Sequence, residues 1–75
     1  MTMNSQARFL QTITAIGNEI YVPIKDIASV HYFFENKLYH IEIHMRSEDF
    51  FEEVYEDALK AENRVLKIQK IIGAE

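Results

Sequence analysis

Hydrophobic and polar residues alternate along the first part of the chain, and a period of two is typical of β-strands. Residues 8–16 form the first such stretch, which is rich in β-branched residues, and residues 19–24 resume the pattern. Gly17 and Asn18 lie between them. Because glycine suits the first central position of a type II′ turn, we predict a two-residue hairpin. Pro23 lacks an N–H group, so the second strand is expected to end there or to lie at a sheet edge.

A second hairpin is predicted from residues 27–34 and 38–46, with Asn36 and Lys37 at the centre of its turn. In this register one face of the hairpin is entirely apolar or aromatic, whereas a slip of one residue would mix the two faces. The apolar face pairs Phe34 with Tyr39, Tyr32 with Ile41, Val30 with Ile43 and Ala28 with Met45. The other face pairs Phe33 with His40, His31 with Glu42 and Ser29 with His44.

After the second hairpin the apolar spacing changes to three and four, which predicts a helix over residues 47–72. Ser47 suits the N-cap, the acids that follow suit the positive end of the helix dipole, and Gly73 is a natural stop. The predicted fold is therefore α+β: a four-stranded antiparallel meander followed by one long C-terminal helix (ββββα). The chain is read as one domain, residues 1–75, with a flexible start at 1–7 and the sheet at 8–46. The residues expected in the core are Ile13, Val22, Val30, Tyr32, Phe34, Ile41, Ile43, Phe51, Val54 and Leu59.

The predicted helix is long for the predicted sheet. About 25 residues span ~37 Å, whereas four strands measure only ~15–20 Å across. The projecting end would expose apolar residues, and its basic half would complement the acidic half of an antiparallel copy. We therefore expect a homo-oligomer, a dimer or higher, in which a helix seam faces another subunit. The alternative is a shorter helix, frayed or bent near Glu62–Arg64, that folds back and packs within its own chain. The seam residues are Ala61, Val65, Leu66, Ile68 and Ile72.

Composition narrows the classes of function. The chain of 75 residues has no cysteine, so neither a disulfide nor a thiolate-bound metal stabilises it. Its net charge of −4 arises within residues 48–75, where eight acids meet four bases. An acidic chain without a basic patch is a poor ligand for nucleic acid phosphates. No apolar run is long enough to span a membrane and no secretory signal is evident, so we expect a cytoplasmic protein with no membrane partner.

The histidines are the first candidates for chemistry, since the sequence His40-x-Glu42-x-His44 resembles a metal site. On a strand, however, the two histidines stand ~13 Å apart, and one zinc ion with ~2.0–2.1 Å bonds cannot reach both. A compact cluster would instead join His31 to Glu42 across the strands, with His40 or His44 on the diagonal. A solvated or subunit-facing pair, a pH-sensitive or small-ligand site and a metal site are the three interpretations. A carboxylate beside His31 should raise the histidine pKa.

We favour the ligand- or subunit-facing interpretation and predict no metal, no cofactor and no catalytic residue. The face concerned carries His31, Phe33, His40, Glu42 and His44. Two glycines are too few for a phosphate-binding loop, and no serine has the context of a nucleophile. An RNA-binding sheet would display such rings among basic residues, which are scarce here.

The expected function is that of a small, non-enzymatic, homo-oligomeric interaction or regulatory module that acts by binding protein. One alternative is a protein that binds or sequesters a small molecule, a nucleotide or metabolite, between subunits. Another is a phage-type inhibitor or acidic mimic of nucleic acid that presents residues 48–57. A metal-dependent enzyme using His31 and Glu42 is the last.

The stretch YVPIKDIASV, residues 21–30, joins the last strand of the first predicted hairpin to the first strand of the second, which leads to an acidic helix. In this order of elements, from Gly17 to about Val54, the chain resembles the small FlbD-type family of flagellar regulators and swarming-motility proteins. The present sequence differs from that family by a longer first strand and a much longer terminal helix. The resemblance implies a ββββα unit and carries over no functional residue.

Overall fold

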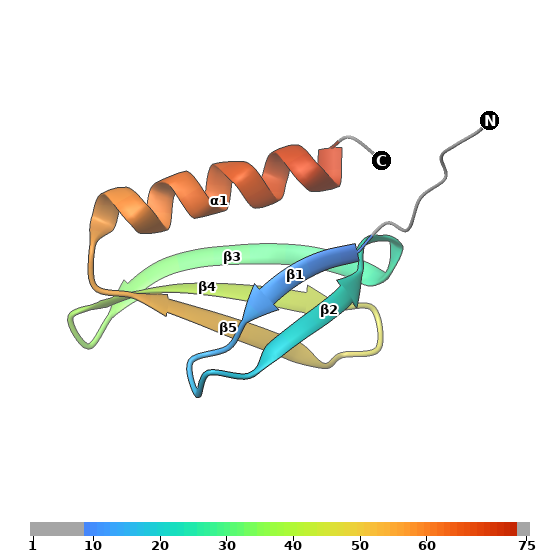
Figure 1. Cartoon of the computed structure of the whole chain (residues 1–75), viewed down its shortest axis with the longest axis horizontal. Coiled ribbons are helices and arrows are strands. Elements are labelled where there is room, and N and C mark those ends of the chain that lie inside the picture. Colours follow the sequence, from blue (N-terminus) through green and yellow to red (C-terminus); the bar gives the residue numbers. More distant parts are fainter. Residues whose placement is uncertain (1–8, 74–75) are drawn as a thin grey trace.

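The computed structural model describes residues 9–73, so the predicted flexible start at 1–7 lies outside the described residues. Within them the chain is α+β, with antiparallel strands followed by one C-terminal helix (Figure 1). The prediction of a single four-stranded meander is wrong, because the strands are five and form two sheets, β1–β2 and β3–β4–β5. The elements are β1 (Phe9–Ile13), β2 (Glu19–Pro23), the 3-10 helix η2 (Ile24–Asp26), β3 (Ile27–Glu35), β4 (Leu38–Met45), β5 (Phe50–Tyr55) and α1 (Ala58–Gly73).

The β3–β4 hairpin has the predicted register over most of its length. Asn36 and Lys37 form its turn with φ of 55° and 65°, the two left-handed residues of a type I′ turn. At the far end the register shifts, so that Ile27 and not Ala28 lies opposite Met45. The bulge returns Ile27 to the apolar face, where it is buried, and leaves Ala28 exposed.

A fifth strand, β5, occupies the first part of the predicted helix. Ser47 is no N-cap: it lies in a hairpin turn in which the Met45 N–H donates to Asp49 O (2.8 Å) and the Glu48 N–H to Met45 O (3.0 Å). β5 then pairs antiparallel with β4. The spacing of Phe51 and Tyr55 suits one face of a helix, but it suits one face of a strand equally. The β-forming run FFEEVY, supported by pairing with β4, adopts the strand.

The β1–β2 hairpin forms where predicted, but through a longer turn. Ile13 pairs with Glu19, and the Gly17 N–H donates to Thr14 O (2.8 Å). Gly17 has a φ of 90°, so it takes the left-handed position that follows a tight turn, and not the centre of a type II′ turn. Leu10 and Thr12 are buried, whereas the predicted core residue Ile13 faces outward and is exposed. The Ala15 N–H bonds Glu52 O (3.1 Å), which joins the hairpin to the edge of β5.

Helix α1 covers one face of the three-stranded sheet (Figure 1). The Asp57 carboxylate accepts the Leu59 N–H (3.1 Å) and begins the helix after the acidic stretch. Sixteen residues at ~1.5 Å make a helix of ~24 Å, close to the ~27 Å of the eight-residue strand β4, so α1 does not project past the sheet. The expected length mismatch is therefore absent. As in the alternative, the helix is shorter and packs within its own chain, but it runs unbroken through residues 62–64 and is short because residues 50–55 form β5.

The core lies between α1, the inner face of the three-stranded sheet and the β1–β2 hairpin. Of the predicted core, Val22, Ile41 and Ile43 are buried, Val30, Phe51 and Val54 partly so. Tyr32, Phe34 and Leu59 are exposed, because β3 is an edge strand and Leu59 lies on the outer side of α1. The buried hydrophobic residues are Leu10, Val22, Ile24, Ile27, Ile41, Ile43, Met45, Ala61, Val65 and Ile68.

This packing corrects the prediction that the helix seam faces another subunit. Ala61, Val65 and Ile68 are buried against their own sheet, and Ile72 is partly buried beside them. Ala61, Val65 and Ile68 are therefore not available to a second copy. Leu66 lies on the outer side of α1 and is exposed. Within residues 9–73, no helix has both the length and the apolar character needed to cross a membrane.

Candidate functional site

The sheet face opposite α1 collects the histidines. Because side chains alternate along a strand, the residues whose neighbours point into the core point to this other side. We call it the open face, since α1 lies on the opposite side of the sheet (Figure 1). The register places all five predicted site residues on it. The open face consists of Ser29, His31, Phe33, Glu35, Leu38, His40, Glu42, His44, Phe50, Glu52 and Val54.

Aromatic and imidazole rings run across all three strands of the open face. Phe33 and His40 stack with centroids 5.0 Å apart and an interplanar angle of 5°. His44 stands between His31 (4.5 Å, tilted) and Phe50 (5.3 Å, stacked at 14°). Ring pairs at these distances are within the range of favourable aromatic contacts. Phe50, on β5, was missed from the sequence because residues 47–72 were read as helix.

Each of the two histidines of β4 pairs with a glutamate. His40 Nδ1 lies 2.8 Å from Glu52 Oε2, and His40 Nε2 lies 3.0 Å from Glu35 O. His44 Nε2 lies 2.8 Å from Glu42 Oε1. His31 lies opposite Glu42 as predicted, but the two side chains do not bond each other. The Glu42 carboxylate bonds His44 on its own strand instead. His31 Nε2 instead lies 3.0 Å from Ser29 Oγ.

The pKa of His40 is raised above its ordinary value. The Glu35 carbonyl and the Glu52 carboxylate both stabilise the imidazolium form, the carbonyl most, and together they outweigh the effect of burial. The His40 side chain is only 14% exposed, because Phe33 stacks on it and β5 lies beside it.

The arrangement does not favour metal binding. Among residues 9–73, no group of three or more His, Asp or Glu side chains is placed to hold a metal ion. His44 bonds Glu42 and packs against His31, so these three members of the cluster proposed from the sequence are in contact, whereas His40 bonds Glu52 instead.

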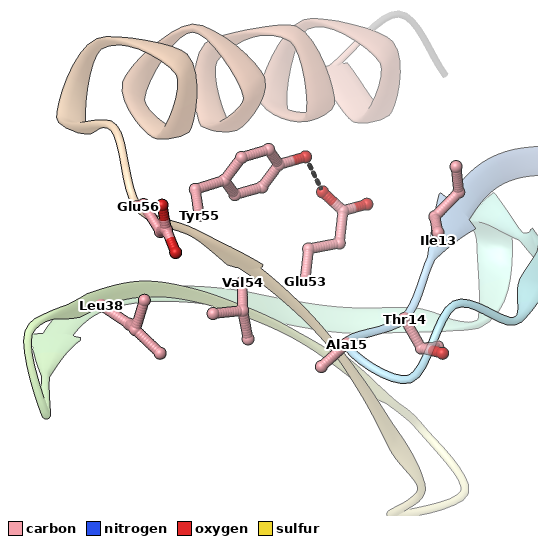
Figure 2. Close-up of a pocket in the computed structure, with 8 residues that line it drawn as sticks. All are labelled: Ile13, Thr14, Ala15, Leu38, Glu53, Val54, Tyr55 and Glu56. Atoms are coloured by element: carbon pink, nitrogen blue, oxygen red, sulfur yellow. Dashed lines mark hydrogen bonds between the residues drawn. The ribbon is translucent and has the colours of Figure 1, made fainter.

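A groove continues the open face around the edge of β5. It encloses ≈ 620 Å³, and Leu38 and Val54 of the open face line it together with Ala15 of the hairpin turn (Figure 2). Glu53 and Tyr55 border it from the helix side. The rings of the open face thus lead into an apolar groove at the β5 edge. No sequence signal indicated the groove, because it forms between segments about 40 residues apart.

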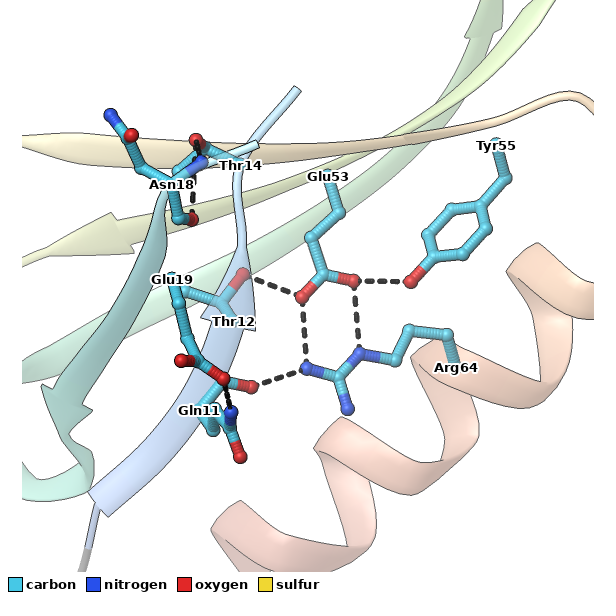
Figure 3. Close-up of polar contacts among 8 residues, drawn as sticks. All are labelled: Gln11, Thr12, Thr14, Asn18, Glu19, Glu53, Tyr55 and Arg64. Atoms are coloured by element: carbon cyan, nitrogen blue, oxygen red, sulfur yellow. Dashed lines mark hydrogen bonds and ion pairs between the residues drawn. The ribbon is translucent and has the colours of Figure 1, made fainter. Parts of the chain in front are cut away.

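A buried carboxylate, also missed from the sequence, lies behind that groove. Glu53 is 2% exposed and accepts four hydrogen bonds (Figure 3). Oε1 accepts from the Tyr55 hydroxyl (2.7 Å) and Arg64 Nε (2.9 Å). Oε2 accepts from the Thr12 hydroxyl (2.5 Å) and Arg64 Nη2 (2.8 Å). Arg64 Nη2 also donates to Gln11 O (2.7 Å), so the cluster links β1, β5 and α1.

These contacts decide the charge state of the cluster. Burial by itself would raise the pKa of Glu53, but the hydrogen bonds from Arg64, Thr12 and Tyr55 outweigh it and hold the pKa below its usual value. Burial and the Glu53 carboxylate raise the pKa of Tyr55 to about 12. Glu53 is thus a fully hydrogen-bonded anion with no lone pair left for substrate, and its role is to dock the hairpin and the helix.

Charge separates the open face from the helix. The open face carries Glu35, Glu42 and Glu52, and no lysine or arginine belongs to it. The acids that were expected to form the first half of a helix lie instead in the β4–β5 turn, in β5 and in the segment before α1. Helix α1 itself is basic, with four bases, Lys60, Arg64, Lys67 and Lys70, against one acid, Glu62.

No family model, no curated protein and no solved structure matches this chain. The resemblance to FlbD-type flagellar regulators therefore stays a prediction.

Proposed function

We propose that this chain is a small non-enzymatic module that acts by binding a basic segment of another protein on its open face. The observation that carries the proposal is the combination, on one sheet face, of stacked rings with three glutamates and no lysine or arginine. Arginine is the side chain that suits such a surface, since its guanidinium plane stacks on rings and pairs with carboxylates.

The exposure of the rings supports a binding role. Phe50 is 54% exposed although it is a large apolar side chain. His31, on the other side of His44, is exposed as well. The groove next to Val54 supplies apolar surface for the aliphatic side chains of the same segment. Buried rings at the centre of an interface supply much of its binding energy.

The non-enzymatic part of the proposal is supported by the state of the acids. The buried carboxylate of Glu53 is neutralised by Arg64 and fully hydrogen-bonded. The carboxylates of Glu42 and Glu52 lie opposite each other on β4 and β5, and each bonds a histidine. The groups best suited to acid–base chemistry are thus used within the chain.

The proposal is tested with defined peptides and NMR. We expect a 12-residue peptide of alternating arginine and leucine to shift the amide signals of the open face in β3, β4 and β5. A glutamate–leucine peptide of equal length should bind at least ten-fold more weakly. The double variant Phe50→Ser, His44→Ser should weaken binding of the arginine peptide at least ten-fold.

The matched control is Tyr21→Ser, which removes an equally exposed ring from β2, outside the open face. It should bind the arginine peptide as the wild type does. Equal binding of the two peptides, or an unchanged affinity in the double variant, would show that the open face is not the binding surface.

A further inference from the structure

Strand β3 presents an unpaired edge. It is the outer strand of the β3–β4–β5 sheet, and no described residue pairs with its other side. The two-residue turn makes Glu35 and Leu38 a hydrogen-bonded pair, so the bonding alternates and the N–H and C=O groups of Val30, Tyr32 and Phe34 point away from β4. The same alternation points Glu52 O away from β4 on β5, where the Ala15 N–H bonds it.

This edge lacks the protection that proteins give to free strand edges. Residues 30–34 read VHYFF, with no proline, glycine or charged residue, and the only register shift of β3 lies before them, at Ile27/Ser29. The outer strand of the other sheet, β2, is short and ends at Pro23. The outer edge of β5 is partly closed by Ala15. Long, apolar, unprotected edges are sites where another chain adds a strand.

We propose that β3 pairs antiparallel with β3 of a second copy, about a two-fold axis that passes between the two Tyr32 residues. In this register Tyr32 lies opposite itself, and Val30 of each copy lies opposite Phe34 of the other. These three pairs use every outward N–H and C=O group of the stretch, two hydrogen bonds a pair. A shift by two residues in either direction would leave some of these groups unpaired or run into the bulge at Ala28 or the turn.

Side chains support this register over the others. Phe34 is 59% exposed and Tyr32 is 39% exposed, both on the side of the sheet that carries α1. A cavity of ≈ 280 Å³ lies between β3 and α1, bordered by Val30, Gln69 and Ile72. Because Phe34 of one copy stands opposite Val30 of the other, each phenyl ring lies at the mouth of the other copy's cavity. The two-fold axis repeats this contact, so that Phe34 of each copy meets the cavity of the other. A symmetric dimer requires such a self-complementary surface.

The dimer would also enlarge the open face. A two-fold axis perpendicular to the sheet keeps both helices on one side and joins two three-stranded sheets into one of six strands. On the other side His31 of each copy would lie beside Phe33 of its partner, so the rings would run without a break between the two open faces. Binding of a basic segment on the joined surface rests on the proposed function. The dimer itself forms without any other protein.

Sedimentation equilibrium of the purified chain tests the pairing. The wild type should dimerise reversibly. Tyr32→Lys and Tyr32→Glu each place like charges across the axis and should raise the dimer Kd at least ten-fold. An equimolar mixture of the two variants should dimerise again, since the lysine of one then faces the glutamate of the other. Tyr21→Lys, a matched change on the β2 edge, should sediment as the wild type does.

A cysteine variant gives a readout that does not depend on weakened folding. The chain has no cysteine, so oxidised Tyr32→Cys should form one disulfide between copies, because the Cα atoms of a hydrogen-bonded pair lie ~5.5 Å apart and within disulfide reach. Phe50→Cys, on the open face away from β3, should stay unlinked. A wild type that is monomeric at ~1 mM, or a Tyr32→Cys variant that does not crosslink, overturns the pairing. Loss of peptide binding in the open-face variants leaves both results unchanged, so the two proposals fail separately.

Discussion

Arg64 of α1 binds the Glu53 carboxylate of β5 with two parallel hydrogen bonds, 2.9 Å from Nε to Oε1 and 2.8 Å from Nη2 to Oε2. A bidentate pair of this kind fixes both the distance and the orientation of the two elements that carry it. Arg64 also bonds Gln11 O, and Thr12 bonds Glu53, so the same contact holds the β1–β2 hairpin. Three segments of a small chain thus meet at one ion pair.

Removing one partner of this pair should be costly. We expect Arg64→Met to lower the free energy of unfolding by about 3–5 kcal/mol, because it leaves the Glu53 charge buried without its counter-ion. The double variant Glu53→Gln, Arg64→Met should cost less than the sum of the single changes by more than ~1 kcal/mol. Urea unfolding at pH 7 measures this, with Lys60→Met, on the exposed side of α1, as the control. Additive costs would mean that the two residues do not interact in solution.

Glu53 should also govern acid stability. Its pKa is lower in the folded chain than in the unfolded one, so its contribution to stability is present above the unfolded value of about 4.5 and is lost as the pH falls through the folded value. Glu53→Gln should therefore reduce the dependence of unfolding free energy on pH below ~5, whatever it does to stability at pH 7. Urea titrations from pH 7 to 3 check this. The control, Glu56→Gln, changes an exposed acid outside the cluster and should keep the wild-type profile.

His40 should have the opposite dependence on pH. Its pKa is raised above the ordinary 6.5, so its contribution is fully present below that value and is lost as the pH rises through the folded pKa. We expect the His40 ring signals in NMR to titrate above pH 6.5, and Glu52→Gln to lower that midpoint. Glu42→Gln, which removes the partner of His44, should leave it in place. A His40 midpoint at or below 6.5 in the wild type would contradict the bonds to Glu35 and Glu52.

Glu48 occupies a backbone position that favours glycine. The turns at residues 14–18 and 45–49 have the same pair of hydrogen bonds, and their left-handed residues are Gly17 (φ 90°) and Glu48 (φ 78°). We expect Glu48→Gly to raise the free energy of unfolding by about 0.5–1 kcal/mol, since glycine adopts this φ without steric cost.

The reverse change is the matched test. Gly17→Ala should destabilise by about 1 kcal/mol through φ alone, because an added Cβ would meet no atom within 4 Å. Thermal and urea unfolding measure both variants. If both are neutral, the two turns do not hold these dihedral angles in solution.

The start of α1 offers a smaller test. The Asp57 carboxylate accepts the Leu59 N–H, so Asp57→Ala should cost about 0.5–2 kcal/mol of stability, and Asp57→Ser or Asp57→Asn should recover most of it. Ser47→Ala, at the N-cap predicted from the sequence, should have little effect because Ser47 lies in an exposed turn and bonds only Asp49. The opposite ranking of the two alanine variants would support the longer helix.

Local pattern determined the parts of the fold in which neighbours along the chain interact. The β3–β4 register followed from alternation, because a one-residue slip exchanges the two faces of both strands. That register by itself places His31, Phe33, His40, Glu42 and His44 on one face. The presence of a C-terminal helix with Ala61, Val65 and Ile68 on its apolar side was determined in the same way, although their partner is the sheet of their own chain.

Tertiary structure decided what the pattern left ambiguous. Residues 50–55 satisfy either a helix or a strand, and only pairing with β4 made them a strand. Strand β5 then shortened the helix and brought Glu53 within reach of Arg64 and Thr12, from parts of the chain 11 and 41 residues away. The sequence by itself thus determined the faces of its strands, since periodicity is a local property. The helix start, the ion pair and the free β3 edge were decided only by the tertiary structure, since each depends on which distant segment lies alongside.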